Sequence, residues 1–273
     1  MTETMTETMT ETMTANGTAD EASACAEGKY LYGIIDAPAP ATFAAPGIGG
    51  RGDVVHTFAV GRLAAVVSDS PRIEYDNSRR HMMAHTRVLE EVMASHTLLP
   101  VCFGTVAVGT EVIAEKILSG RREELTAHLE QMRGRMELGL KASWREEVVF
   151  EEVLAEDPGI RKLRDSLIGK SPDKTHFERI RLGEQIGQAL ERKRREDEER
   201  ILGRVRPFVH KTKLNKPIGD RMVINGAFLV EAAHEAALDR SIRAMDAEWG
   251  ERLTFKYVGP VPPYNFVAIV IHW

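Results

Sequence analysis

The chain has 273 residues, of which 43% are apolar and 28% are charged, so it is long enough for one large domain or two modest ones. Its net charge of −5 and its pI near 6.0 exclude a general attraction for nucleic acid or for an anionic membrane surface. Its two cysteines exclude a secreted disulfide framework, and no apolar run reaches the roughly 18 residues of a spanning helix. We therefore expect a cytoplasmic protein.

Residues 1–28 differ in composition from the rest of the chain. The stretch MTETMTETMTETMT repeats a four-residue polar unit. Its few apolar groups cannot offset the entropy lost when a chain becomes ordered, so we expect a disordered tail. Two interpretations stay open: a flexible acidic tether, or an extension without a role.

Three strands are predicted at the start of the folded part, which begins at Lys29. KYLYGIID is rich in β-forming residues and ends before Pro38. VVHTFAV and RLAAVVS follow and are joined through Gly61, as in a tight hairpin.

The period then changes to that of a helix between Arg79 and His96. One face is formed by residues that recur at spacings of three and four: Met82, Thr86, Leu89, Val92 or Met93, and His96. A buried strand or loop is predicted for LLPVCFGTVAVG. Two short helices, over about 110–118 and 121–133, come next and are separated by Gly120.

Clean alternation from Met136 to Trp144 predicts one half-buried strand. The N-terminal part therefore has a pattern of strands with helices on one face of the sheet. This is typical of an α+β layer of the ferredoxin-like kind.

A helical stretch is expected from Arg145 to Ile168, with an interruption at Asp157-Pro158. A long helix from Thr175 to Arg206 follows, and its middle holds ten consecutive charged residues, 191–200. Ion pairs one turn apart are expected there, such as Arg192–Glu196, Arg194–Glu198 and Arg195–Glu199. We expect this segment to stand in water or to face a charged partner.

A second layered unit is predicted at the C-terminal end. Its expected elements are strands in PFVHKTKLN, DRMVINGAFLV, LTFKYVG and NFVAIVIH, and a helix from Glu231 to Trp249. The final strand is apolar on both faces, which predicts a central position in the sheet.

The predicted fold class is thus α+β, with two ferredoxin-like layered domains joined by a helical segment. The expected divisions are the tail (1–28), an N-terminal α+β domain (29–145), a helical connector (146–172) and a C-terminal α+β domain that begins with the charged helix (173–273).

Motifs of catalysis and cofactor binding give little support to an enzyme. Gly47-x-Gly49-x-x-Gly52 matches a dinucleotide fingerprint as a string, but a strand follows it where the mechanism needs a helix. Cys102 lies among apolar residues, which indicates a buried thiol. We expect no cofactor.

Two histidines one helical turn apart are the strongest candidates for a metal site. His81 and His85 have this spacing, with Asp76 and His96 as conceivable further ligands. The Glu of a hydrolytic H-E-x-x-H motif is absent. We expect ordinary surface or satisfied histidines, and no metal.

Four stretches occur in a specific order: VLEEVMASHTLLPVCFGTV, GRMELGLKASW, NGAFLVEAAHEAALDRSIRAM and RLTFKYVGPVPPYNFV. In this order they resemble the gas vesicle protein F/L family over residues 29–273. The matching motif residues are Leu99, Pro100, Phe103, Gly104, Thr105, Gly259, Pro260, Pro262, Pro263, Tyr264, Phe266 and Val267. We call the first five the FGT signature and the last seven the PPY signature. The sequence departs from the family at Cys102, where a basic residue is common.

The resemblance implies an accessory protein without enzymatic activity, which helps to nucleate or assemble the gas vesicle shell. Its implied partners are the small hydrophobic shell subunit and other vesicle proteins, with no nucleic acid and no membrane. Its implied place is the cytoplasm and the vesicle, including the gas-facing side of the shell.

Two questions stay open from the residues. The PPY signature is interpreted either as a corner that locks the last two strands together or as a docking edge for the shell subunit. The subunit could pair with the strand edge around 209–214 or lie on the face of the first sheet. The alternative function is a metal-dependent enzyme or a small-molecule-binding module on a ferredoxin-like scaffold.

Overall fold

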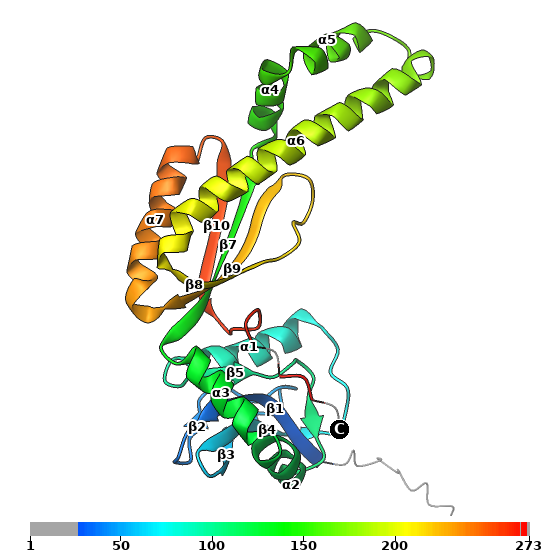
Figure 1. Cartoon of the computed structure of the whole chain (residues 1–273). Helices are drawn as coiled ribbons and strands as arrows, with labels where there is room; N and C mark the ends of the chain where they lie inside the picture. Colours follow the sequence, from blue (N-terminus) through cyan, green and yellow to red (C-terminus); the bar gives the residue numbers. More distant parts are fainter. Residues whose placement is uncertain (1–26, 268, 272–273) are drawn as a thin grey trace, which may run out of the picture.

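The computed structural model of the chain describes residues 27–267 and 269–271 (Figure 1). Two sheets, each with its own helices, form two units, and a pair of long helical segments projects from the second unit. The predicted α+β class is therefore confirmed. The prediction of a disordered tail falls on residues outside the described part, apart from Glu27 and Gly28, which begin the first strand.

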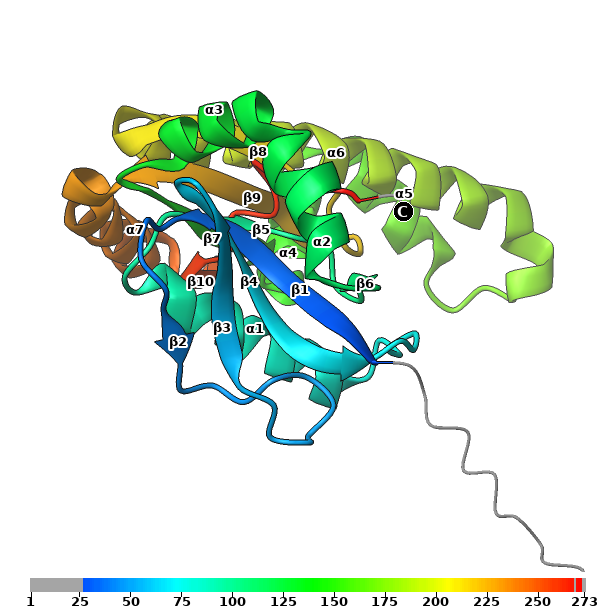
Figure 2. The same cartoon turned by 90° about the horizontal axis from the view of Figure 1, so that it is seen from below.

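The first sheet is antiparallel, with the strand order β2-β3-β4-β1-β5, and β6 also pairs with β1 (Figure 2). Its strands are β1 (Glu27–Asp36), β2 (Thr42–Phe43), β3 (Val55–Val60), β4 (Leu63–Pro71), β5 (Leu98–Pro100) and β6 (Val106–Ala107). The predicted hairpin between β3 and β4 is confirmed. Its turn contains Gly61 at φ 66°, a value that costs glycine little because it has no Cβ.

Helices cover both faces of this sheet, so the prediction that they lie on one face was wrong. Helix α1 (Arg79–Met93) packs on one face through Val88, Leu89 and Val92. The other face is covered by the π-helix η1 (Ile113–Ser119), which follows α2 (Thr110–Val112), and by α3 (Arg122–Met132).

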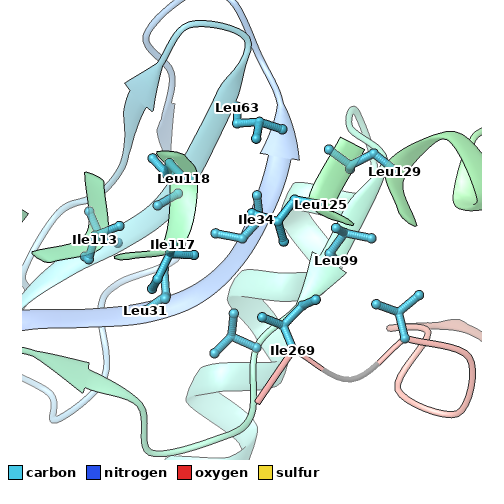
Figure 3. Close-up of a cluster of buried hydrophobic side chains, with 14 of the residues drawn as sticks. Leu31, Ile34, Leu63, Leu99, Ile113, Ile117, Leu118, Leu125, Leu129 and Ile269 are labelled. Atoms are coloured by element: carbon cyan, nitrogen blue, oxygen red, sulfur yellow. The ribbon is translucent and has the colours of Figure 1, made fainter. Parts of the chain in front are cut away.

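Figure 3 shows the core beneath η1 and α3, with Leu31 and Ile34 of β1 facing Ile117 and Leu125. The first six residues of β4 are all buried. Because successive side chains of a strand point to opposite faces, both faces of the sheet must be covered by helices.

The second sheet is also antiparallel, with the order β10-β7-β9-β8. Its strands are β7 (Arg135–Trp144), β8 (Val209–Leu214), β9 (Met222–Glu231) and β10 (Leu253–Val261). Helices α6 (His176–Val205) and α7 (Glu235–Trp249) pack on one face. In chain order these elements form the βαββαβ pattern of a ferredoxin-like unit.

Strand β7 was predicted correctly as a strand but assigned to the wrong sheet. It pairs with β9 and β10 and has no partner in the first sheet among the described residues. Period-2 alternation reports that a strand has one buried face and carries no information about its neighbours.

A helical arm leaves the second sheet between β7 and the second half of α6 (Figure 1). It contains α4 (Glu146–Glu156), α5 (Pro158–Leu167) and the short η2 (Pro172–Thr175). The predicted interruption is confirmed, because the Asp157 side chain accepts hydrogen bonds from Gly159 N and Ile160 N and begins a new helix. Single turns η3 (Arg206–Phe208) and η4 (Ala232–His234) flank β8 and α7.

The ten charged residues of α6 do not all stand in water. Asp197 is buried and accepts hydrogen bonds from Trp144 Nε1 at 2.8 Å and Arg252 Nη2 at 2.7 Å. Lys193 is buried between Glu152 and Glu156 of α4. The charged partner is therefore the protein itself.

The ion pairs recorded along this helix differ from the expected ones. Both Arg194 and Arg195 pair with Glu191, and Glu199 pairs with Arg206.

The final segment crosses to the first unit, so the predicted central strand of the second sheet was wrong. Val267 and Ile269 are buried in the core of the first unit, and Ile269 forms a parallel bridge with Val101. Figure 3 shows Ile269 beside Leu99 in this core. A segment that is apolar on both faces must be buried on both sides. The core of the first unit buries this segment, so it need not be a central strand of the second sheet. Residues 268, 272 and 273 lie outside the described part.

Candidate functional site

The two signatures, distant in sequence, lie at the junction of the two units. Leu99 and Pro100 belong to β5, and Phe103 to Thr105 form the turn after it. Gly259 and Pro260 end β10, and the rest of the PPY signature lies in the crossing segment. The structure therefore brings the FGT and PPY signatures to one region.

His85 of α1 links the two signatures directly. Its Nε2 lies 2.7 Å from Tyr264 Oη, and its Nδ1 lies 3.0 Å from Tyr30 Oη. The hydroxyl of Tyr30 also accepts the backbone N–H of Gly104 at 2.9 Å. A chain of hydrogen bonds thus runs from the tyrosine of one signature to the glycine of the other.

Burial keeps His85 neutral at pH 7. The side chain is 2% exposed, and desolvation lowers its pKa to about 4. A neutral imidazole donates from one nitrogen and accepts at the other, which satisfies both tyrosines. The same burial raises the pKa values of Tyr30 and Tyr264 above the ordinary value of tyrosine, so both stay protonated.

The metal interpretation of the histidines finds no supporting geometry. His81 Nδ1 lies 2.5 Å from Asp76 Oδ1, while both nitrogens of His85 already contact tyrosines. His96 contacts Ser95. In the part of the chain that the structure describes, no three His, Cys, Asp or Glu side chains are grouped to hold a metal ion.

Sequence reasoning placed Leu89, and Val92 or Met93, on the packed face of α1, but it assigned Met82 and Thr86 to that face and left out His85. The buried face of α1 is His85, Val88, Leu89 and Val92, whereas Met82 is 41% exposed. The spacing 85, 88, 89, 92 is itself a helical stripe and contained the signal.

A buried carboxylate fastens the PPY signature to the second sheet. Glu137 of β7 is 3% exposed and accepts hydrogen bonds from Asn265 N at 3.0 Å and Asn265 Nδ2 at 2.6 Å. Burial raises the pKa of Glu137, and the two bonds from Asn265 oppose that rise. Asn215 completes the group by donating to Asn265 Oδ1 at 3.2 Å.

The crossing segment is therefore fastened to both units, through Tyr264 on one side and Asn265 on the other. One of the two interpretations from the sequence was a corner that locks the last two strands together. The structure has a corner that joins two sheets instead.

Two sequence motifs remain, the glycine-rich loop 47–52 and Cys102. The glycine-rich loop 47–52 is closed by the bond from Gly47 N to Asp53 O, and β3 follows it, so no helix N-terminus faces the loop. Cys102 is half-buried, so the prediction of a buried thiol was wrong. It lies in the turn of the FGT signature, where its carbonyl accepts a bond from Thr105 Oγ1.

An apolar cavity of about 490 Å³ opens beside the fastened segment, and we call it the junction cavity. Its apolar wall consists of Met93, Leu98, Met132, Met136, Pro260 and Pro263. Glu90, His96 and Arg135 supply polar groups to its lining. Methionine side chains are flexible and polarizable, so such a wall can adapt to differently shaped apolar groups.

Comparison with known proteins places this architecture in a family. The sequence profile of "Gas vesicle synthesis protein GvpL/GvpF" matches residues 28–268. Gas vesicle protein F of Microcystis aeruginosa is 26% identical over 89% of this chain and 99% of its own length. Gas vesicle protein F of a Streptomyces species is 30% identical, over 87% of this chain and 98% of its own.

Solved structures agree with the sequence relatives. The crystal structure of gas vesicle protein F from an Anabaena species has a TM-score of 0.76 and 26% identity, and covers 89% of this chain and 99% of that one. The Microcystis aeruginosa crystal structure has a TM-score of 0.72 at 25% identity, with 88% and 98% covered. Within the described residues, no helix is both long and apolar enough to span a membrane. The chain belongs to the GvpL/GvpF family of gas vesicle synthesis proteins.

Proposed function

We propose that this protein is a non-enzymatic accessory protein that helps to nucleate or assemble the gas vesicle shell. It acts in the cytoplasm by binding the hydrophobic shell subunit and other vesicle proteins. Its position on the gas-facing side of the shell is part of the proposal and rests on the family resemblance alone.

The junction cavity is the observation that carries this proposal. It is lined mainly by apolar side chains, it is built from both units, and two of its lining residues, Pro260 and Pro263, belong to the PPY signature. A shell subunit that is apolar enough to exclude water from a gas space would aggregate if it were released alone. An adaptable apolar cavity can cover one of its apolar segments until the subunit is added to the shell.

The edge of the second sheet is a further candidate surface. Strand β8 lies at the end of the strand order, and residues 210–214 are all exposed. Among the described residues only β9 pairs with it, so its outer edge is a candidate for β-augmentation, although the charges of Lys211 and Lys213 discourage unspecific pairing. The face of the first sheet, considered from the sequence, is covered by helices on both sides and is no longer a candidate.

Capture of the purified shell subunit by the tagged full chain tests the cavity. We expect the double variant Met93→Glu/Met136→Glu to reduce capture at least fivefold, because a carboxylate in the cavity opposes entry of an apolar segment. Both methionines are half-buried, so the charged side chains can reach solvent, and circular dichroism of the variant checks that the fold is kept.

Met82→Glu/Met83→Glu is the matched control. Both residues lie on α1, as Met93 does, and they are 41% and 42% exposed outside the cavity. Capture should be unchanged by the control pair. Equal capture by wild type and the cavity variant would remove the cavity from the proposal, and Lys213→Pro, which alters the β8 edge, would then test the edge. If neither variant weakens capture, shell-subunit binding by these surfaces is wrong.

A further inference from the structure

No helix covers one face of the second sheet within the described residues. The end of this face near the first unit is buried at Glu137 and Leu229, and the rest carries a group of lysines. Leu138, Leu140 and Ala142 of β7 point toward α6 and α7, so the residues between them point to the other side. Cross-strand pairing places four lysines on that side, and we call them the lysine face: Lys141, Lys211, Lys213 and Lys256. All four are exposed.

Two of these lysines oppose each other without a counterion. Lys141 of β7 and Lys256 of β10 are direct cross-strand partners. Like charges in this position destabilise a sheet, because the side chains lie close together. Across the described residues, no carboxylate lies within 4.0 Å of any of the four lysine ammonium groups, although the whole chain has a net charge of −5. An anionic occupant would relieve this repulsion.

The middle of the lysine face admits a polypeptide backbone. A shallow cavity of about 420 Å³ lies there, lined by small residues that include Gly139, Gly226 and Ala227, together with Lys141 and Lys256. Glu137 also lines it, and its two carboxylate oxygens accept hydrogen bonds from Asn265. Asn225 offers a polar side chain between them.

The face lacks what a nucleic acid would need. Sheets of this topology bind single-stranded RNA by stacking bases on aromatic side chains of the open face. Here the central positions hold Gly139, Ala227 and Asn225, while Phe255 and Tyr257 of β10 pack on the helix side. An acidic polypeptide fits the chemistry better.

The chain contains such a polypeptide in its first 26 residues. They carry five carboxylates, at Glu3, Glu7, Glu11, Asp20 and Glu21, and no lysine, arginine or histidine. A chain of this length reaches up to about 86 Å when extended, at about 3.3 Å per residue. It starts from β1, whose first residue is Glu27.

We propose that the acidic segment 1–26 binds the lysine face of the second sheet and acts as a removable cover for it. An acidic partner of the protein must then displace this segment before it can use the face. The inference does not depend on the proposed role in shell assembly.

Paramagnetic broadening in the full chain tests this contact. A nitroxide is attached at Met9→Cys in a background of Cys25→Ser and Cys102→Ser. We expect amide signals of Lys141, Asn225 and Lys256 to lose at least half of their intensity in 50 mM salt, and to recover in 500 mM salt because the contact is electrostatic.

Two charge variants distinguish the proposal from random encounters. Lys141→Gln/Lys256→Gln should restore the signals on the face, and so should Glu3→Gln/Glu7→Gln/Glu11→Gln in the segment. The matched control Lys162→Gln/Lys170→Gln on the helical arm should leave the broadening unchanged. Broadening confined to residues near Glu27, or broadening that survives Lys141→Gln/Lys256→Gln, would overturn the proposal.

An unlabelled sample guards against a labelled variant that fails to fold. In the natural full chain, the three Glu→Gln changes should shift the amide signals of Lys141 and Lys256 and leave those of the arm in place. A uridine 12-mer is added to the same sample to test whether the lysine face binds single-stranded RNA instead. If the RNA shifts the lysine-face signals and the Glu→Gln variant does not, the face is a nucleic-acid surface and the proposal is wrong.

Discussion

At the residue scale, the hydroxyl of Tyr264 satisfies a buried nitrogen of His85 that has no other hydrogen-bond partner within the described part of the chain. Tyr264→Phe removes that partner and leaves the nitrogen unpaired, which costs about 1–3 kcal/mol of unfolding free energy. Urea unfolding at pH 7 measures the loss. Tyr257→Phe is the control, because the half-buried hydroxyl of Tyr257 has no recorded hydrogen bond, and it should change stability by less than about 0.5 kcal/mol.

Protonation of His85 lowers the stability of the protein in acid. The folded-state pKa of His85 is lowered to about 4, from an ordinary value of 6.5, so the unfolded chain binds the proton more tightly. The stabilising contribution of the neutral ring is therefore complete above pH 6.5 and is lost as the pH falls from 6.5 toward 4. We expect the unfolding free energy of the wild type to fall by about 3 kcal/mol over this pH range because of His85. His85→Gln should not show this fall, and urea unfolding at several pH values measures the difference. Equal pH dependence of the two proteins would show that His85 is already solvated.

Glu137 changes the pH dependence of stability in the opposite direction to His85. Burial raises its folded-state pKa above the ordinary value, so its contribution is largest at low pH and is lost as the pH rises through the folded pKa. Asn265→Ala removes one of the two donors that oppose this rise. We expect the variant to lose about 1–3 kcal/mol of stability at pH 7 and less at pH 5, in urea unfolding at both values. A loss that did not depend on pH would point to packing and not to the carboxylate.

At the element scale, α6 is held by charges that are buried. Asp197→Ala would leave Arg252 with Glu152 as its remaining ion-pair partner in the described structure, and would leave Trp144 Nε1 without its acceptor. Breaking a buried ion pair on one side costs about 3–5 kcal/mol. Arg195→Ala on the exposed side of the same helix should cost less than about 0.5 kcal/mol in the same thermal or urea unfolding experiment. Similar losses for the two variants would contradict a buried network.

Elements of this fold were predictable to different degrees. The hairpin at Gly61, the break at Asp157-Pro158 and the long helix α6 follow from local geometry and capping, which the sequence encodes directly. The partners of β7 and the destination of residues 265–271 depend on contacts between distant segments. Burial patterns specify that such a segment is covered but not what covers it, so both assignments failed.

The candidate site was predictable only as a set of motif residues. The resemblance selected the FGT and PPY signatures, and the structure brings them to one junction. Tyr30 and His85 connect the two signatures, and Glu137 fastens the PPY signature to the second sheet; all three lie outside both signatures. Each is a polar residue within an apolar or alternating pattern, and its partner is set by the tertiary fold.

At the scale of the whole molecule, the crossing segment joins two units with separate sheets. Their cores also meet at Leu229 of β9, which packs in the core of the first unit. It places Val267 and Ile269 in one core and fastens Asn265 to the other unit. Burial of apolar groups in this way makes the two units unfold together, because opening one exposes surface that the segment shares with the other.

A stop codon after Val261 removes this coupling and tests it. Tyrosine near-UV circular dichroism reports the cluster of Tyr30, Tyr32 and Tyr75 in the first unit, and tryptophan fluorescence reports Trp144 and Trp249 in the second. With Trp273 replaced by Phe, the full chain should show both signals changing at the same urea concentration. The truncated chain should lose the tyrosine signal first, because the core of the first unit loses two buried side chains and a cavity remains. A chain shortened by only residues 272 and 273 is the control and should behave as the full chain does. Coincident transitions in the chain that ends at Val261 would mean that the two units are coupled by other contacts.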